Sequence, residues 1–165
     1  MRYHNITTED MINGEGLRVV LWVSGCEHRC EECQNPITWD ENDGLLFDDK
    51  AREEIFNELT KDYISGITLS GGDPLFTSNR EAVCELIKEI KDKFKDKSIW
   101  CYTGYDFEDV RELELLNYID VLIDGKYDKS KSDNLLYWRG SSNQRVIDVN
   151  ESLRSGKIVT LYGGK

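Results

Sequence analysis

The sequence is 165 residues long, enough for one domain with a real core but short of the roughly 250 residues of a complete eight-stranded β/α barrel. Its hydrophobic content of 39% with only two prolines is typical of a globular protein, so we expect residues 1–165 to form a single compact domain. The formal net charge of -11 disfavours nucleic acid as a partner, because phosphate groups carry the same sign. No stretch approaches the ~20 apolar residues of a membrane helix, so we expect no membrane partner.

The first half of the chain shows the apolar patterns of alternating strands and helices. Residues 17–24 form an apolar run typical of a buried strand, and a helix is expected after Asp48. The apolar face of this helix comprises Ala51, Ile55, Phe56 and Leu59. The short β-branched run at 66–70 predicts the next strand, and Ser78 with Glu81 forms a capping-box pattern for a second helix. The apolar stripe of that helix comprises Val83, Leu86, Ile87, Ile90 and Phe94.

The second half continues the alternation and then loses it. Residues 98–103 predict a strand, Asp106 is placed to cap a helix, and residues 119–124 predict another strand. The apolar positions of that helix are Val110, Leu113 and Leu116. The stretch 125–143 is polar and irregular. Two further strands are expected, at residues 145–149 and 157–161.

This order of elements predicts an α/β fold. Near-continuous apolar strands separated by helices are typical of a mostly parallel sheet covered by helices, with right-handed crossovers. In such folds ligands bind at the carboxyl ends of the strands. The unusual motifs of this chain all follow expected strand ends, at residues 24–35, 71–74, 103–105 and 124–125. We therefore expect these four loops to form one site.

Three of the five cysteines lie in the loop after the first expected strand, with the spacing C-x3-C-x2-C. They are Cys26, Cys30 and Cys33. A loop at a strand end can bring three thiolates to one centre, which indicates a metal. A structural zinc site is usually closed by four ligands from two separated pairs, whereas three cysteines leave one iron of a [4Fe-4S] cluster without a protein ligand. The alternatives are His28 as a fourth ligand and a reduced cysteine cluster without metal.

Other residues of these types are expected to be structural. Cys84 and Cys101 fall in a predicted helix and a predicted strand, and we expect both to be small buried hydrophobes. Trp22 and Trp100 fall in strands and are expected in the core. An odd number of cysteines, clustered as ligands, fits a reducing compartment, and the first ten residues lack the pattern of a secretory signal. We therefore expect a cytoplasmic protein.

The cysteine spacing resembles that of the radical S-adenosylmethionine (SAM) superfamily, in which three cysteines hold a [4Fe-4S] cluster and SAM chelates the fourth iron. Further blocks resemble one family of that superfamily, the anaerobic ribonucleotide reductase activating proteins. These blocks are NGEGLR (13–18), SGC (24–26), SGGDPL (70–75), TGY (103–105), DGK (124–126) and WRGSSNQ (138–144). They span most of the chain in the expected order, which makes the resemblance much more specific than one motif would be.

The resemblance implies a partial β/α barrel of the radical SAM type and an oxidoreductase activity. In such an enzyme a reduced cluster gives one electron to SAM, the carbon-sulfur bond breaks, and a 5'-deoxyadenosyl radical takes a hydrogen atom from the substrate. The implied substrate is a glycine Cα in the large catalytic subunit of the anaerobic ribonucleotide reductase, which is left with a glycyl radical. The other implied partner is a low-potential electron donor such as flavodoxin or ferredoxin.

The resemblance also implies which residues contact SAM. In the superfamily the segment equivalent to Gly71, Gly72 and Asp73 lies against the amino group of SAM, and Gly72 is the first choice here because a glycine lets backbone groups approach a ligand. The residues next to the adenosine part are Glu32, Cys33 and Gln34. The sequence departs from the family pattern at this point, since that pattern has a small residue before the third cysteine and tyrosine after it. Adenine stacking therefore stays open.

Two other functions fit parts of the sequence. One is a different radical SAM enzyme, either an activase of another glycyl radical enzyme or another small member of the superfamily. The other is a non-enzymatic metal protein, either a zinc-binding interaction module or an electron carrier. A non-enzymatic protein would need a fourth protein ligand and would not turn over SAM.

Overall fold

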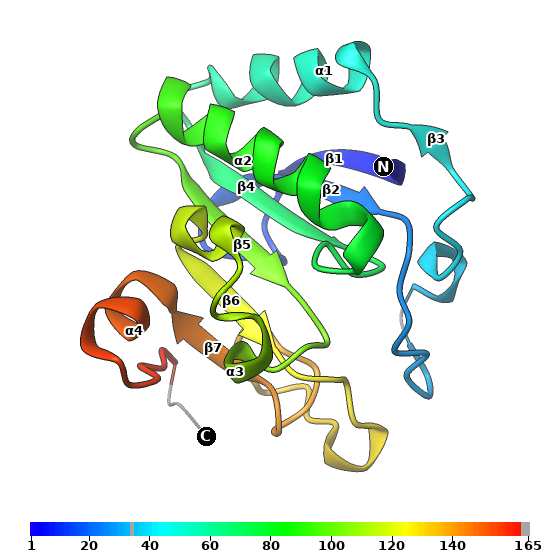
Figure 1. The fold of residues 1–165 in the computed structure, drawn as a ribbon, viewed down its shortest axis with the longest axis vertical. Coiled ribbons are helices and arrows are strands. Elements are labelled where there is room, and N and C mark those ends of the chain that lie inside the picture. The colour runs from blue at the N-terminus through cyan, green and yellow to red at the C-terminus, as the bar shows by residue number, and fades with distance from the viewer. Residues whose placement is uncertain (34, 163–165) are drawn as a thin grey trace.

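The computed structural model describes residues 1–33 and 35–162, and its centre is a seven-stranded sheet with the order β3-β1-β2-β4-β5-β6-β7 (Figure 1). The strands are β1 (Arg2–Asp10), β2 (Leu17–Val23), β3 (Leu45–Leu46), β4 (Ile64–Gly71), β5 (Ser98–Tyr102), β6 (Val121–Asp124) and β7 (Arg145–Asp148). The α-helices are α1 (Asp49–Leu59), α2 (Arg80–Lys93), α3 (Phe107–Val110) and α4 (Val149–Ser155). Short 3-10 helices are η1 (Pro36–Thr38), η2 (Thr77–Asn79), η3 (Glu114–Tyr118) and η4 (Lys129–Lys131).

The predicted parallel sheet forms the centre of the fold. Strands β2, β4, β5 and β6 are parallel neighbours, and the helices that connect them carry the apolar faces expected from the sequence. The edges differ, because β1 and β3 on one side and β7 on the other pair antiparallel. Strand β1 was not predicted, since its residues are mixed and only partly buried. The fold is therefore a mixed α/β fold.

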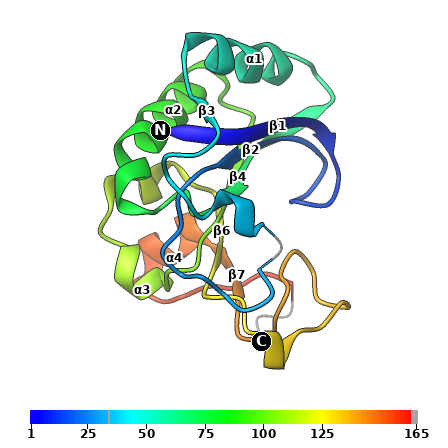
Figure 2. The same ribbon diagram turned by 90° about the vertical axis from the view of Figure 1, so that its right-hand side faces the viewer.

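The two faces of the sheet are covered differently. Along β5, Ile99 and Cys101 join the large core that includes the apolar residues of α1 and α2, whereas Trp100 lies on the opposite face in a smaller cluster with Val121 and Ile123. This alternation follows from the period of two in a strand. Figure 1 looks onto the helical layer, and in Figure 2 the yellow-to-orange loop 125–144 extends away from α1 and α2. The second face is thus covered by loop residues, among them Trp138, Leu161 and Tyr162.

The expected capping box at Ser78 is wrong. Helix α2 begins at Arg80 after η2, and its N-cap residue, Asn79, makes no side-chain capping bond. Instead, the side-chain amide of Asn79 donates to the backbone oxygens of Ser24 (2.8 Å) and Asp73 (3.1 Å). Because these acceptors belong to the loops after β2 and β4, the start of α2 connects two of the four loops at the strand ends.

The region after β5 also differs in detail from the prediction. Asp106 is the N-cap residue of a helix, as expected, but its side chain makes no capping bond and α3 has only four residues. The 3-10 helix η3 carries Leu116, and residue Leu113 precedes it. The helix predicted over this stretch is therefore two short pieces.

The C-terminal part of the chain was predicted least well. The expected strand at 157–161 forms only an isolated bridge between Thr160 and Ile147. Helix α4 was missed; it starts where the Asp148 side chain accepts a hydrogen bond from the backbone N–H of Glu151 (3.1 Å). It is stopped by Gly156 in the left-handed conformation (φ 75°). Across residues 1–33 and 35–162, no helix is long and apolar enough to cross a membrane.

Candidate metal centre

The carboxyl ends of the four parallel strands surround one cavity. Its wall includes the three cysteines of the loop after β2, the segment Gly71–Asp73 after β4, Thr103 and Gly104 after β5, and Gly125 after β6. The structure therefore brings together the four loops that the sequence singled out. Sequence reasoning placed Trp22 in the core, but this side chain is half-buried and lines the same cavity, as does Tyr102.

Backbone contacts hold the cysteine loop in a compact shape. The N–H groups of Gly25 and Cys26 donate to the carbonyl oxygens of Thr38 (2.7 Å) and Trp39 (3.1 Å), so the loop is tied to the segment that follows it. Within the loop, the N–H of Cys33 donates to the carbonyl of Cys30 at 3.1 Å. Left-handed backbone angles at Arg29 (φ 49°) and Glu32 (φ 57°) turn the chain back on itself. All three cysteines are partly buried free thiols.

Burial controls the protonation of these thiols. It raises the pKa of the Cys26 thiol to about 11 and also raises the pKa of the Cys30 thiol. Backbone N–H groups act in the opposite direction: those of His28 and Arg29 lower the pKa of the Cys26 thiol, and that of Tyr127 lowers the pKa of the Cys30 thiol. Both thiols are thus protonated near neutral pH, and a metal would bind with release of protons while keeping these N–H donors.

The three cysteine sulfurs are not gathered as closely as the ligands of one zinc ion. In the described part of the chain, the one set of three candidate ligands whose atoms all lie within 4.8 Å is Cys26, His28 and Asp73, and not the three cysteines. A tetrahedral zinc ion with bonds of about 2.3 Å would hold its sulfur ligands roughly 3.8 Å apart. A cluster in which each thiolate binds a different iron requires a wider separation. Three thiols in one loop are nevertheless the ligand type that iron-sulfur clusters use.

The comparisons with known proteins agree with this chemistry. A family model described as a 4Fe-4S single cluster domain matches residues 12–147. An anaerobic ribonucleoside-triphosphate reductase-activating protein of Enterobacteria phage T4 is 49% identical over 146 residues, which cover 88% of this chain and 93% of that protein. This chain belongs to that family. Proteins of the same name from Haemophilus influenzae and Escherichia coli (strain K12) are 45% and 40% identical over 150 residues, covering 88% of this chain and 97% of each relative.

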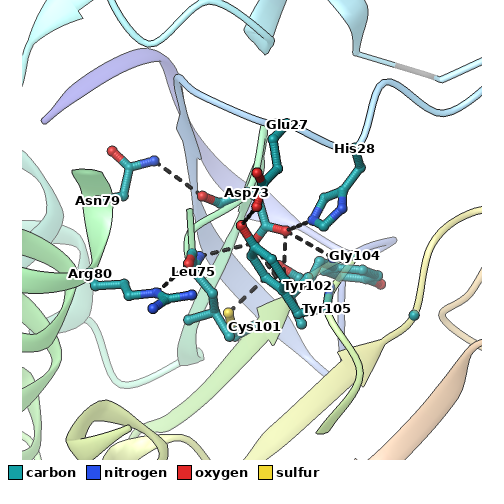
Figure 3. A network of polar contacts seen from close by, with 12 residues as sticks. Glu27, His28, Asp73, Leu75, Asn79, Arg80, Cys101, Tyr102, Gly104 and Tyr105 are labelled. Atoms are coloured by element: carbon teal, nitrogen blue, oxygen red, sulfur yellow. Dashed lines mark hydrogen bonds and ion pairs between the residues drawn. The ribbon is translucent and has the colours of Figure 1, made fainter. Parts of the chain in front are cut away.

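In this reductase-activating family member, Asp73 is the most connected side chain at the cavity (Figure 3). Its side chain is 1% exposed, and one carboxylate oxygen lies 2.6 Å from Nε2 of His28. The carboxylate also accepts hydrogen bonds from the Thr103 hydroxyl (2.8 Å), the N–H of Gly104 (2.9 Å) and the N–H of Leu75 (2.9 Å). One aspartate thus joins the loops after β2, β4 and β5. Sequence reasoning considered His28 only as a ligand, and it placed Thr103 in a loop of the site without giving its side chain a role.

Packing and backbone conformation within the protein require glycine at both positions before Asp73. A Cβ atom on Gly72 would lie 2.5 Å from the carbonyl oxygen of Gly25 and 2.7 Å from that of Thr38, so only glycine fits beside the cysteine loop. Gly71 has a φ of 104°, which side chains other than glycine rarely tolerate. Both residues also line the cavity, and the N–H of Gly72 donates to the carbonyl oxygen of Val23 at 2.9 Å.

The three residues expected beside the adenosine part of SAM differ in their relation to the cavity. Glu32 is exposed and lies 3.4 Å from Nζ of Lys129, and it is not among the described residues that line the cavity. Gln34 lies outside the described residues. Cys33 lines the cavity. Among the remaining cysteines, Cys101 is fully buried as predicted, whereas Cys84 is only partly buried.

Proposed function

We propose that this chain activates an anaerobic ribonucleoside-triphosphate reductase by generating a glycyl radical on its large catalytic subunit. The reaction would be a reductive cleavage of SAM at a [4Fe-4S] cluster held by Cys26, Cys30 and Cys33. The observation that carries this proposal is the single cavity at the strand ends, where three thiols of one loop face glycine-rich backbone from the next strand. The family membership and the names of the relatives support it.

The chain's own residues would bind and orient SAM in this cavity. When bound, the cluster would supply one low-potential electron and an iron that has no protein ligand and can hold SAM. Gly71 and Gly72 line the cavity, and a backbone carbonyl there would accept from the amino group of SAM. Asp73 is the third residue proposed at the amino group, although both of its carboxylate oxygens already accept hydrogen bonds within the protein. The residues proposed beside the adenosine part remain Glu32, Cys33 and Gln34.

The shape of the fold supports a protein as the substrate. We propose a partial β/α barrel of the radical SAM type within a single domain of residues 1–165. Since α1 and α2 cover one face of the sheet and loops cover the other, the second face offers an approach to the cavity for a glycine-bearing segment of the reductase. A low-potential donor such as flavodoxin or ferredoxin would reduce the cluster. The cysteine usage supports a cytoplasmic location.

The test is an anaerobic assay of SAM cleavage with and without the reductase. Protein reconstituted with iron and sulfide, then reduced, is expected to convert SAM to methionine and 5'-deoxyadenosine and to produce a glycyl radical signal by EPR on the reductase. Cys33→Ala should abolish both, because it removes a cluster ligand, whereas Cys84→Ala is the matched control and should keep both.

Other outcomes would separate the alternatives. SAM cleavage without a glycyl radical on the reductase would favour an activase of a different glycyl radical enzyme or another radical SAM enzyme. Stoichiometric zinc with no SAM cleavage would identify a structural metal site and contradict the proposed function. Full activity of Cys33→Ala would contradict the assignment of the ligands.

A further inference from the structure

We propose that His28 is a positioning residue of the metal centre: its ring is anchored on Asp73 and thereby fixes the backbone around Cys26. This inference rests on the cluster site of the proposed function and adds a residue to it. His28 occupies the centre of the first cysteine spacing, two residues after Cys26 and two before Cys30. Any contact that fixes its ring therefore restrains the loop between two ligands.

The ring of His28 is held on several sides. Its side chain is 5% exposed, and Nε2 lies 2.6 Å from a carboxylate oxygen of Asp73. Figure 3 shows the ring pointing toward this carboxylate. The ring also packs edge-on against Tyr105, with 4.5 Å between the ring centroids. The hydroxyl of Tyr105 in turn hydrogen-bonds the carboxylate of Glu27, the residue directly before His28. Tyr105, in the loop after β5, thus contacts two neighbouring residues of the cysteine loop.

Gly104 leaves the space that this ring fills. A Cβ atom on Gly104 would lie 2.7 Å from Cγ and from Nε2 of His28, closer than any real contact of this kind. At the same time the N–H of Gly104 donates to Asp73 at 2.9 Å. Two residues of the segment 103–105 therefore hold the histidine in place. Gly104 leaves room for the ring and donates its N–H to Asp73, and Tyr105 packs against the ring. These three features give the segment a purpose that the sequence alone did not explain.

The anchored ring acts on Cys26 through the backbone. The backbone N–H groups of His28 and Arg29 act on the Cys26 sulfur by lowering the pKa of its thiol, and their positions depend on the shape of this turn. Hydrogen bonds to cluster sulfurs help to set the reduction potential of an iron-sulfur centre, and groups that orient ligands affect how tightly a metal is held. In this role His28 would support the cluster through its contact with Asp73 and the shape of the turn, and not as a ligand.

The experiment compares His28→Gln, which keeps a side-chain N–H donor at a similar reach, with His28→Phe, which keeps the ring and loses the donor. His4→Gln is the matched control, because His4 also lies near an aspartate, 4.0 Å from Asp43, but outside the cysteine loop. Each protein is reconstituted with iron and sulfide. The readouts are iron per chain, the rate of cluster loss to a chelator, and the EPR signal of the reduced cluster.

We expect His28→Phe to lose its cluster roughly 10- to 100-fold faster than the wild type and to show an altered EPR signal, because the anchoring bond is gone. His28→Gln and His4→Gln should stay close to the wild type in all three readouts. If His28→Phe does not fold, Gly104→Ala provides the same test, since the added Cβ displaces the ring, and it should lose the cluster over the same range.

Several results would overturn the inference. Retention by His28→Phe with loss by His28→Gln would show that ring packing alone matters. Loss by both variants with a nitrogen ligand seen by EPR in the wild type would identify His28 as a ligand. Equal stability of all variants, or equal loss that includes His4→Gln, would remove the special role of His28. None of these readouts uses SAM, so a wild type that holds a cluster but cannot cleave SAM contradicts only the proposed function.

Discussion

At the scale of single residues, Arg18 shows how much one buried side chain can organise. It is fully buried in β2, and its guanidinium donates five hydrogen bonds, to Thr68, Ser98, Ile67 and Glu15. Burial lowers its pKa to about 10, which still leaves it charged at neutral pH. The guanidinium thus connects β4, β5 and the loop before β2. All five acceptors are uncharged oxygens: four belong to β4 and β5, and the fifth is the backbone oxygen of Glu15.

Arg18→Met is expected to destabilise the protein by about 3 kcal/mol or more, since several buried acceptors would lose their donor. The measurement is the midpoint of urea unfolding of the cluster-free chain. Arg154→Met is the control, because the side chain of Arg154 is 71% exposed and pairs with its helix neighbour Glu151. A loss for Arg18→Met no larger than that of the control would show that the network contributes little.

At the scale of elements, two aspartates that precede helices have different roles. Asp48 caps α1, and its side chain accepts a hydrogen bond from the N–H of Ala51 at 3.0 Å. Asp106 occupies the same position before α3 but makes no such bond, and burial raises its pKa. Both helices follow an aspartate in the sequence, so the sequence does not distinguish the two positions. The structure shows that Asp48 makes a capping bond and that Asp106 does not.

Asp48→Ala should therefore cost about 1 kcal/mol of unfolding free energy, the usual value for a lost N-cap bond. Asp106→Ala is the matched variant and should cost clearly less. Urea unfolding monitored by circular dichroism gives both values. Equal losses would mean that the capping bond at Asp48 is not the source of stability, and a larger loss for Asp106→Ala would reverse the interpretation.

At the scale of the whole molecule, one hydrophobic core links the parts of the chain. Buried residues of this core come from β2, α1, β4, α2, β5 and β6, and they continue as far as Val149 at the start of α4. The cavity with the cysteines lies at the carboxyl ends of the same strands. A core that reaches from one edge of the chain to the other supports the proposal of a single domain.

We expect a single cooperative unfolding transition for the cluster-free chain. Far-ultraviolet circular dichroism reports mainly on the helices, whereas fluorescence reports on Trp22, Trp39, Trp100 and Trp138, which lie in β2, in β5 and in loops. The two signals should have the same urea midpoint. Separate midpoints would show that the site and the helical layer unfold independently and would contradict the single domain.

Much of the centre of the fold could be predicted because its signals are local. The apolar runs of β2 and β4 and the stripes of α1 and α2 depend on neighbours along the chain, and each was found. Strand β1 and helix α4 were missed. Strand β1 lies beside the two-residue edge strand β3 and is only partly buried, so its sequence need not be apolar. Helix α4 begins directly after Asp148, the last residue of β7, and the strand pattern there hid the start of the helix.

The sequence by itself determined the chemistry: the cysteine spacing, the order of the glycine-rich blocks and their place after strand ends are fixed by neighbours in the chain. Only the tertiary structure decided which groups meet. His28 and Asp73 are 45 residues apart, and Arg18 and Ser98 are 80 apart. Their contacts depend on the twist and spacing of the packed strands, which no local pattern records. For that reason the sequence could predict the three cysteines as ligands but not the contact between His28 and Asp73 beside them.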